Sequence, residues 1–352
     1  VIQDTASTST LTALLCARER ATGWGVYERG AGAKGAQDLR VYTSQEAHSS
    51  VDKGVILAGY GRENLRRIAT DENFALDPCA LEAAVQKDIE AGLCPAAVVA
   101  TLGTTGSTAI DPLPAIGKIC ERHGIWLHVD AALAGTAALL EEKRGLFSGL
   151  EQADSFVFNP HKWLFTNFDC SAYYVKDPQP LLRTMSTDPE YLKTTHDAQV
   201  DNYRDWGVPL GRRFRALKLW FVLRSYGREG LQARVRRHLE LASGFAEWVR
   251  ESQDWELAAP VPLNLVTFRF QPSRERATGR WSGPLSPDAQ DRLNEAILQR
   301  VNATGRCMLT HTRLHGRYTL RLSVGQTETQ ARHVREAWEL LNQIAHTQLP
   351  GA

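Results

Sequence analysis

Short apolar runs and amphipathic stretches alternate along the first half of the chain. Ala96–Thr101 and Ile125–Asp130 are largely apolar runs of strand length, as in parallel strands that are covered on both faces. Between them, Leu113–Arg122 has the apolar spacing of a helix. The pattern predicts an α/β fold: a mostly parallel sheet flanked by helices, with a functional site at the carboxyl edge of the strands.

The same patterns predict the other elements of this half. Strands are expected at Leu39–Thr43, Leu65–Ala69, Asp154–Phe158 and Ser171–Val175, and helices at Leu11–Arg18, Ser44–Leu57 and Asp77–Ala84. A Gly-rich loop is expected from Gly23 to Asp38. From Lys176 to Pro209 the periodicity is lost, which predicts a functional lid or a disordered segment.

The last third of the chain predicts a smaller α+β domain. Helices are expected at residues 210–223, 231–249, 288–302 and 327–343, and strands at 263–270, 308–311 and 318–324. We therefore predict a large domain of residues 1–218, with a mobile loop at about 178–208, and a small C-terminal domain of residues 219–352.

Composition argues against several classes of function. Of the 352 residues, 43% are hydrophobic and 23% are charged, as in ordinary globular proteins. A net charge of +1 argues against nucleic acid or an anionic membrane as a partner. No apolar run reaches the ~18 residues of a membrane span, and no signal peptide is visible. The six cysteines lack zinc-site spacing, so we expect no metal, free thiols and a cytoplasmic location.

Lys162 is the position around which this sequence is organised. It follows the apolar run Phe156–Phe158, where an ammonium group is costly to bury. A lysine is kept in such a place when its neutral amine forms a Schiff base with a carbonyl compound. Upstream, the strand that ends in Asp130 supplies a carboxylate. Together the two residues suggest an enzyme that uses pyridoxal 5'-phosphate (PLP).

A PLP site also needs a phosphate anchor and a flat group against the ring. The predicted helix start at Thr5–Ser7 suits a phosphate, and His48 follows a predicted strand. Each feature has a simpler explanation: Asp130 as a helix cap, His48 as a surface histidine, and Thr5–Ser7 as an ordinary capped helix start. His128 is interpreted as a core histidine.

Five longer motifs carry a resemblance to a known family. They are H-V-D-A-A-x-A-G at His128–Gly135, F-N-P-H-K-W at Phe158–Trp163, N-F-D-C-S-A at Asn167–Ala172, A-H-S-S-V at Ala47–Val51 and P-L-G-R-R-F-R at Pro209–Arg215. The chain resembles the group II PLP-dependent decarboxylases, closest to aromatic L-amino acid decarboxylases, essentially from residue 1 to the C-terminal helix. The resemblance implies fold type I and an obligate homodimer with its active sites at the interface.

The resemblance also implies roles for individual residues. Lys162 would be the Schiff-base lysine and Asp130 the partner of the pyridinium nitrogen, while His48 would stack on the ring and meet the substrate carboxylate. The other cofactor contacts would be Thr5, Ala6, Ser7, Thr105, Asp111, Ala132, Asn159 and His161. The substrate contacts would be Phe168, Gly211 and again His161.

Tyr191 matches the tyrosine of the family's mobile catalytic loop, which protonates the substrate carbon and reaches into the site of the partner subunit. The implied reaction is decarboxylation of an aromatic L-amino acid to the amine and CO2. In related aldehyde synthases the tyrosine is often phenylalanine, or the stacking histidine is asparagine. This chain keeps Tyr191 and His48, which favours decarboxylation. An aldehyde synthase, a decarboxylase of an acidic amino acid and an inactive PLP-binding partner chain are the alternatives.

The sequence departs from the family at two points, and one further position bears on the choice of substrate. In the family, an N-terminal segment clasps the dimer and supplies part of the substrate pocket. The sequence has no such segment before Val1, so we expect a fragment or a processed piece. A separate N-terminal chain is one way to complete the site. Leu133 stands where relatives commonly carry tyrosine, which would alter the substrate pocket or the dimer contact. Gly211 stands where glycine accompanies indolic substrates in plant relatives, which favours tryptophan-like substrates over DOPA, tyrosine and phenylalanine.

Overall fold

The computed structural model describes residues 1–187, 200–272 and 286–347. The chain forms two compact units, one of residues 1–104 and 110–231 and the other of residues 105–109 and 232–352. The predicted boundary after residue 218 stays a prediction, because a compact unit need not be an independently folding domain. Among the described helices, none combines the length and the apolarity that crossing a membrane requires.

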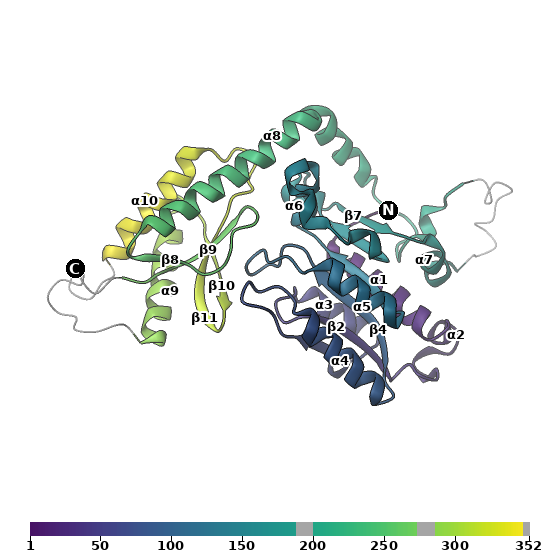
Figure 1. Ribbon diagram of the computed structural model, residues 1–352. Helices are drawn as coiled ribbons and strands as arrows, with labels where there is room; N and C mark the ends of the chain where they lie inside the picture. Colours follow the sequence, from purple (N-terminus) through teal and green to yellow (C-terminus); the bar gives the residue numbers. More distant parts are fainter. Residues whose placement is uncertain (188–199, 273–285, 348–352) are drawn as a thin grey trace. The chain divides into compact units, whose positions relative to one another are not determined.

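The first unit is built on a seven-stranded sheet, counted over the described residues, with the order β1-β7-β6-β5-β4-β2-β3 (Figure 1). The strands are β1 (Ile2–Gln3), β2 (Leu39–Ser44), β3 (Leu65–Ile68), β4 (Cys94–Thr101), β5 (Trp126–Asp130), β6 (Ser155–Phe158) and β7 (Ser171–Val175). Strands β2 to β6 are parallel, whereas β7 is antiparallel to both β6 and β1. Two antiparallel steps make β1 parallel to β6, so β1 ends at the same edge of the sheet as the parallel strands.

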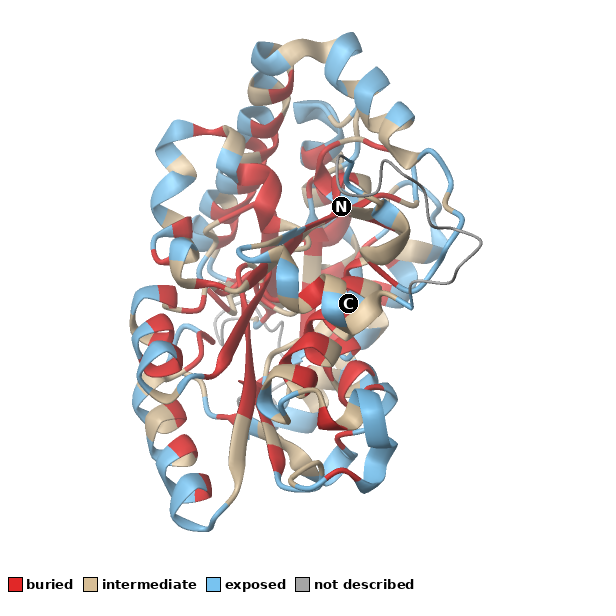
Figure 2. Cartoon of the chain, turned by 90° about the vertical axis from the view of Figure 1, so that its right-hand side faces the viewer, coloured by how far each residue is buried: buried red, intermediate tan, exposed pale blue. Residues whose placement is uncertain are grey.

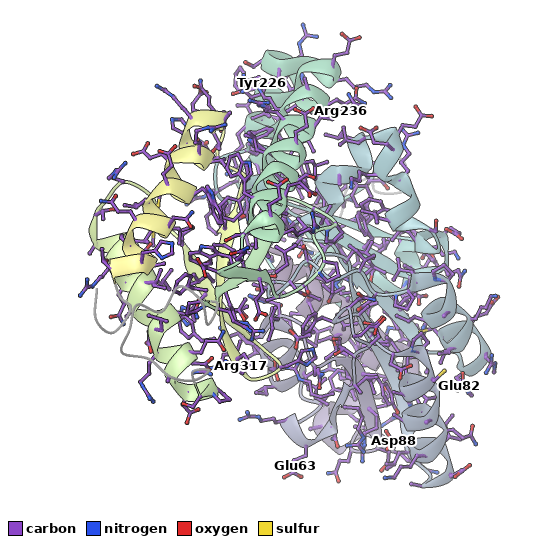
Figure 3. The ribbon with its side chains drawn as sticks, turned by 60° about the vertical axis from the view of Figure 1, so that its left-hand side comes forward. Glu63, Glu82, Asp88, Tyr226, Arg236 and Arg317 are labelled. Carbon is purple, nitrogen blue, oxygen red and sulfur yellow. The ribbon has the colours of Figure 1, made fainter. Side chains whose placement is uncertain are left out.

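Helices lie on both faces of this sheet. The described α-helices of the unit are α1 (Ala6–Ala21), α2 (Gly25–Arg29), α3 (Ser50–Leu57), α4 (Pro78–Glu90), α5 (Leu113–His123), α6 (Pro160–Trp163) and α7 (Pro178–Met185). Short 3-10 helices are η1 (Gly30–Gly32), η2 (Arg62–Asn64), η3 (Ala134–Leu139), η4 (Glu141–Phe147), η5 (Leu150–Gln152) and η8 (Tyr203–Asp205). α1 covers one face, where the Thr10 hydroxyl lies 3.3 Å from Nε2 of His128 on β5. α4 covers the other, where Asp88 (Figure 3) accepts a hydrogen bond from the Tyr42 hydroxyl of β2. Buried residues therefore concentrate along the strands (Figure 2).

The second unit contains a four-stranded antiparallel sheet in its described part, with the order β10-β11-β9-β8. Its elements are β8 (Trp255–Leu257), β9 (Leu265–Phe270), α9 (Pro287–Ala303), β10 (Thr310–Leu314), β11 (Arg317–Ser323), α10 (Ala331–Thr347) and the later part of α8 (Arg215–Glu251). Phe268 and Leu320 on one face of the sheet form a core with Phe245 of α8. The predicted fold class, a mostly parallel α/β sheet followed by a smaller α+β region, is confirmed.

Several element boundaries shift by a few residues, and two differences have a clear local cause. The helix expected from Ser44 begins at Ser50, because Ser44 is still paired with Ile68 of β3 and belongs to β2. The region expected to lack periodic structure from Lys176 onwards contains α7. The Asp177 side chain caps this helix by accepting the Gln179 amide, and Pro178 occupies its first position.

Three further segments also differ. The Gly-rich stretch expected to be a loop contains the short helix α2. The helices expected at 210–223 and 231–249 are one element, α8, which begins only at Arg215. It is interrupted at Gly227, whose φ of 65° and ψ of 173° are not helical and suit a residue without a side chain. The strand expected at 308–311 is β10, two residues further along the chain.

Candidate active site

Four segments that carry predicted site residues come together at one edge of the first sheet. His48 follows β2, and Asp130 is the last residue of β5. Lys162 lies on α6 directly after β6, and Thr5 follows β1. Because these strands are parallel, their carboxyl ends meet at one edge, where open α/β sheets bind ligands. β5 and β6 are direct neighbours, with Asp130 opposite Val157.

The Lys162 side chain is held on the short helix α6, which starts at Pro160 and is preceded by the cap residue Asn159. The side chain is exposed, so the expectation of burial holds only in part. Surrounding protein atoms nevertheless displace part of its hydration and lower the pKa of the ammonium, while the nearby carboxylate of Asp130 acts in the opposite direction. The result is an accessible amine that loses its proton more readily than an ordinary surface lysine.

Asp130 is a buried carboxylate, and only one of its two oxygens has a hydrogen bond to a described residue. Its Oδ1 accepts the amide of Ala132 at 2.9 Å, and only 5% of the residue is exposed. Beneath it on the same strand, His128 is fully buried between the hydroxyls of Thr10 and Ser155. Burial lowers the pKa of His128 to about 4, so the ring is neutral, as the interpretation of a core histidine requires.

His48 is exposed at the junction between β2 and α3. Its Nδ1 accepts the amide of Ser50 at 3.1 Å and lies 2.9 Å from the Ser50 hydroxyl. Because Nδ1 accepts a backbone N–H, the neutral ring carries its proton on Nε2. The ring is thereby fixed by one nitrogen and offers a donor with the other.

The start of α1 provides an anion site of the predicted kind. Thr5 caps the helix by accepting the Thr8 amide, while its own amide donates to Asp4. Ser7 is exposed and Ala6 is buried in this first turn, whose amides have no partner within the helix. Asn159, the cap residue of α6, is buried, and its side-chain oxygen has no hydrogen-bond partner among the described residues.

The rings of His161, which precedes Lys162, and Phe168 are in contact. Their ring centroids are 4.6 Å apart, and Nδ1 of His161 accepts the amide of Cys170. Burial lowers the pKa of His161, and the charge of Lys162 adds to this effect. Phe168 itself is 73% exposed, so its face is free to contact a ligand.

Asp111 is fully buried and uses both carboxylate oxygens on the backbone. Oδ1 accepts the amide of Leu76 and Oδ2 that of Thr101, at 2.8 and 2.7 Å. Burial raises the pKa of this carboxyl to about 6, although the two amides oppose the shift. The arrangement holds the end of β4 in place, and the expected cofactor contact of Asp111 stays a prediction.

For three predicted residues the described structure does not test a place at the site. Thr105 belongs to the second compact unit. Tyr191 lies outside the described residues. Gly211 is exposed, and a side chain at this position would meet no atom within 4 Å. Their expected roles remain predictions.

Sequence reasoning assigned no role to Asp169, although it lies within the motif N-F-D-C-S-A. Its carboxylate accepts hydrogen bonds from Arg215 and Lys218 at the start of α8, which hold its pKa well below the usual range. Asp169 thus ties the segment after Lys162 to α8. The signal, an acid in one motif and a basic run in another, is present in the sequence, but a separation of 46 positions conceals the pairing.

Comparison with known proteins agrees with this geometry. The pattern of the pyridoxal-dependent decarboxylase conserved domain matches residues 1–271. The chain belongs to the pyridoxal-dependent decarboxylase family. Among its relatives, phenylacetaldehyde synthase of Arabidopsis thaliana is 42% identical over 98% of this chain and 68% of its own length. Tryptophan decarboxylase 2 of Oryza sativa subsp. japonica is 41% identical over 98% of this chain and 67% of its own.

Solved structures of other members of the pyridoxal-dependent decarboxylase family have the same fold. The crystal structure of Oryza sativa TDC with PLP and tryptamine superposes with a TM-score of 0.92 at 38% identity, over 99% of this chain and 70% of that one. Rhodiola rosea 4-hydroxyphenylacetaldehyde synthase superposes with a TM-score of 0.87 at 30% identity, over 99% and 70%. The predicted family and cofactor class are confirmed.

The residues of this chain fit PLP. The accessible amine of Lys162 suits an aldehyde, and the free oxygen of Asp130 suits a protonated ring nitrogen. The open first turn of α1 suits the phosphate, and the unpartnered side-chain oxygen of Asn159 can accept a hydrogen bond from a donor group. Each of these polar groups lacks a described protein partner that would compete with the cofactor.

Proposed function

We propose that this chain catalyses the PLP-dependent decarboxylation of an aromatic L-amino acid to the amine and CO2. The observation that carries the proposal is the meeting of Lys162, Asp130, His48 and the start of α1 at one edge of the sheet. Tryptophan-like substrates are favoured over DOPA, tyrosine and phenylalanine. The tryptophan, tyrosine and aromatic-L-amino-acid decarboxylases among the relatives support this substrate class.

Lys162 and Asp130 divide the work of holding the cofactor. The amine of Lys162 holds the aldehyde carbon, and its lowered pKa favours the neutral, nucleophilic form. Bound PLP supplies an acceptor for the electron pair that the departing CO2 leaves behind. Asp130 keeps a proton on the ring nitrogen, because a buried carboxylate favours a facing cation. Thr5, Ala6, Ser7 and Asn159 bind the phosphate.

His48 orients the substrate. With Nδ1 engaged by Ser50, its Nε2–H points away from the backbone and donates to the carboxylate that is to be lost. Tyr191 delivers the proton that replaces CO2. His161 and Phe168 form an aromatic wall for the side chain of the substrate. Thr105 and Ala132 complete the cofactor contacts, with Asp111 holding the backbone behind them.

The test is a product analysis. The chain, loaded with PLP, is incubated separately with tryptophan, DOPA, tyrosine, phenylalanine and glutamate, and amines and aldehydes are identified by mass spectrometry. We expect an aromatic amine, formed fastest from tryptophan. Lys162→Ala should lose roughly a thousand-fold or more in kcat/KM and also the visible absorbance band that borohydride removes from the parent chain. Turnover of glutamate alone would contradict the proposal, and bound PLP without turnover would indicate an inactive partner chain.

An aldehyde synthase is the second candidate, because a phenylacetaldehyde synthase is among the relatives at 42% identity. The presence of Tyr191 and His48 argues against it. Tyr191→Phe should lower the yield of amine and raise that of aldehyde and hydrogen peroxide, with O2 as the oxidant. An unchanged product ratio in this variant would remove the role given to Tyr191.

We further propose a homodimer. Large apolar side chains are exposed at the start of α8 and just before it, which is typical of an interface. They are Val208, Leu210, Phe214, Leu217, Trp220 and Phe221. Sedimentation should find a dimer of the parent chain and a monomer of Trp220→Asp. A monomeric parent chain would favour completion by a separate N-terminal chain.

The cytoplasm is the proposed location. All six cysteines are free thiols, three of them buried, which suits a reducing compartment. Fractionation of cells that express the tagged protein tests this.

A further inference from the structure

The face of β6 and β7 that points away from α1 is open. On this face Phe156 lies opposite Tyr174 across the two strands, and Phe158 follows two residues along β6. The three rings lie with centroid separations of 5.9 to 6.4 Å between them. Tyr174 is 56% exposed, and both phenylalanines are only half-buried. Three clustered aromatic rings are thus partly exposed on two adjacent strands of the sheet.

These rings form the floor of a groove of about 640 Å³. One wall is the chain that follows Asp130, including Leu139 and Phe147 of η3 and η4. This wall is built closely onto the floor: a Cβ at Gly135 would lie 2.3 Å from that of Phe158. We call the feature the β6–β7 groove. Its lining also includes Leu150, Ala153, Leu164 and Val175.

The β6–β7 groove lies where the helix layer of this face is incomplete. α4 contacts β3 and β4, and α5 contacts β4 and β5. No residue within the described α-helices lines the groove over β6 and β7. Parallel sheets in α/β proteins are covered by helices on both faces. By this comparison, one more helix is expected next to α5, over β6 and β7.

The rim of the β6–β7 groove is positively charged. Arg144 is exposed and has no ion-pair partner among the described residues. The Lys176 ammonium donates only to the backbone oxygen of Glu151, at 3.0 Å. Glu151 is the acidic member of the lining, so two cations face one carboxylate. An occupant with an apolar face and acidic residues along its flank would match both the floor and the rim.

We propose that the β6–β7 groove binds an amphipathic helix with an aliphatic or aromatic face and acidic flanking residues. The lengths of the relatives indicate a source for such a helix. The matches span 98% or more of this chain but only 67% of the rice and 69% of the mouse relative. The family therefore has protein outside the matched region, and the helix is to be found there. This proposal does not depend on the substrate or on catalysis.

The test uses the full chain and synthetic peptides. Overlapping peptides of the unmatched part of rice tryptophan decarboxylase 2, each labelled with a fluorophore, are titrated onto the 352-residue chain, and binding is followed by anisotropy and circular dichroism. We expect one peptide to bind, to gain helicity and to raise the Tm of the chain. Hydrogen exchange should slow at β6, β7 and η3 upon binding. If no peptide binds, or if protection appears elsewhere, the proposal is overturned.

Substitutions separate this site from other apolar surfaces. Tyr174→Asp should weaken the peptide at least ten-fold, and Arg144→Glu should weaken it a few-fold and make the remaining binding less sensitive to salt. Leu57→Asp, which changes an equally exposed apolar residue on α3, should leave binding unchanged. Equal binding by the Tyr174→Asp variant would overturn the proposal. So would dissociation of a dimer by Tyr174→Asp, since a second copy would then occupy the groove.

Discussion

The two faces of the first sheet differ most at β6 and β7. Val157 and Tyr173 point towards α1 and are almost completely buried, whereas Phe158 and Tyr174, their neighbours in sequence, point to the other face and line the open groove. The same two strands are thus covered by α1 on one face and partly exposed on the other. On the covered side, Trp126, His128 and Asp130 are alternate residues of β5, and all three are buried.

This difference separates what positions the site from what completes the molecule. Asp130 is held by the strand beneath it, whose residues on the α1 face are hydrogen-bonded and buried. The open face contributes no hydrogen bond to Lys162 or Asp130 among the described residues. We therefore expect substitutions on the covered face to disturb folding and the site together. Truncation of the exposed rings on the open face should disturb neither until an occupant is present.

Adjacent tyrosines give the largest expected contrast. Tyr173→Ala removes a fully buried ring against His128 and should lower the free energy of unfolding by ~3–5 kcal/mol. Tyr174→Ala removes a largely exposed ring and should cost less than ~1 kcal/mol. Urea titration of both variants measures the difference. Equal costs would mean that the open face is already covered within the chain.

A pH titration sharpens the comparison on the covered face. The pKa of His128 is lowered from 6.5 to about 4, so between these values the unfolded chain takes up a proton that the folded chain does not. Its contribution to stability is therefore lost as the pH falls through this window, by up to ~3 kcal/mol. His128→Gln lacks this term. The difference in free energy of unfolding between parent and variant should shrink from pH 7 to pH 4, and a constant difference would contradict a neutral buried ring.

Asp111 acts in the opposite direction in part of the same window. Its carboxyl has a pKa of about 6 instead of 3.8, so the folded chain holds a proton more tightly and loses stability as the pH rises between these values. The two effects oppose each other in the parent chain. For this reason the titration compares variants and not the parent chain alone.

Two glycines give the smallest expected effect. Gly135→Ala places a methyl group against Phe158 on the wall of the groove and should cost ~1–3 kcal/mol through overpacking. Gly211→Ala has open space around the new carbon and should change stability by less than ~0.5 kcal/mol. Thermal unfolding of the two variants measures both effects. A neutral Gly135→Ala would mean that the wall moves freely and that the groove is not a preformed site.

Much of the fold could be predicted from the sequence. Runs such as β4 and β5 are long, apolar and bounded by loops, so their type and order follow from periodicity. The start of α3 could not, because Ser44 is a good cap in sequence but is held in β2 by its partner Ile68. α7 was missed although Asp177 and Pro178 mark its start, because the loss of periodicity around it outweighed a local signal.

The site was predicted unevenly for a physical reason. Residues at strand ends, such as Asp130 and Lys162, are placed by the sheet order, which the sequence pattern implies. Residues whose contacts depend on distant partners are not predicted in this way: Asp169 accepts a hydrogen bond from Arg215, and Asp111 accepts the amides of Leu76 and Thr101. The exposure of Lys162 is likewise a property of the surrounding surface, which local sequence does not specify.

The division of the chain has a consequence for synthesis on the ribosome. The second compact unit includes residues 105–109, which emerge more than a hundred residues before the rest of that unit begins. This short piece is joined at both ends to the first unit and completes its own unit only when the residues from 232 onwards have been made. Such separation raises the contact order and slows the last step of folding. A nascent chain released before residue 232 would lack the rest of the second unit, so residues 105–109 would have none of their partners within it.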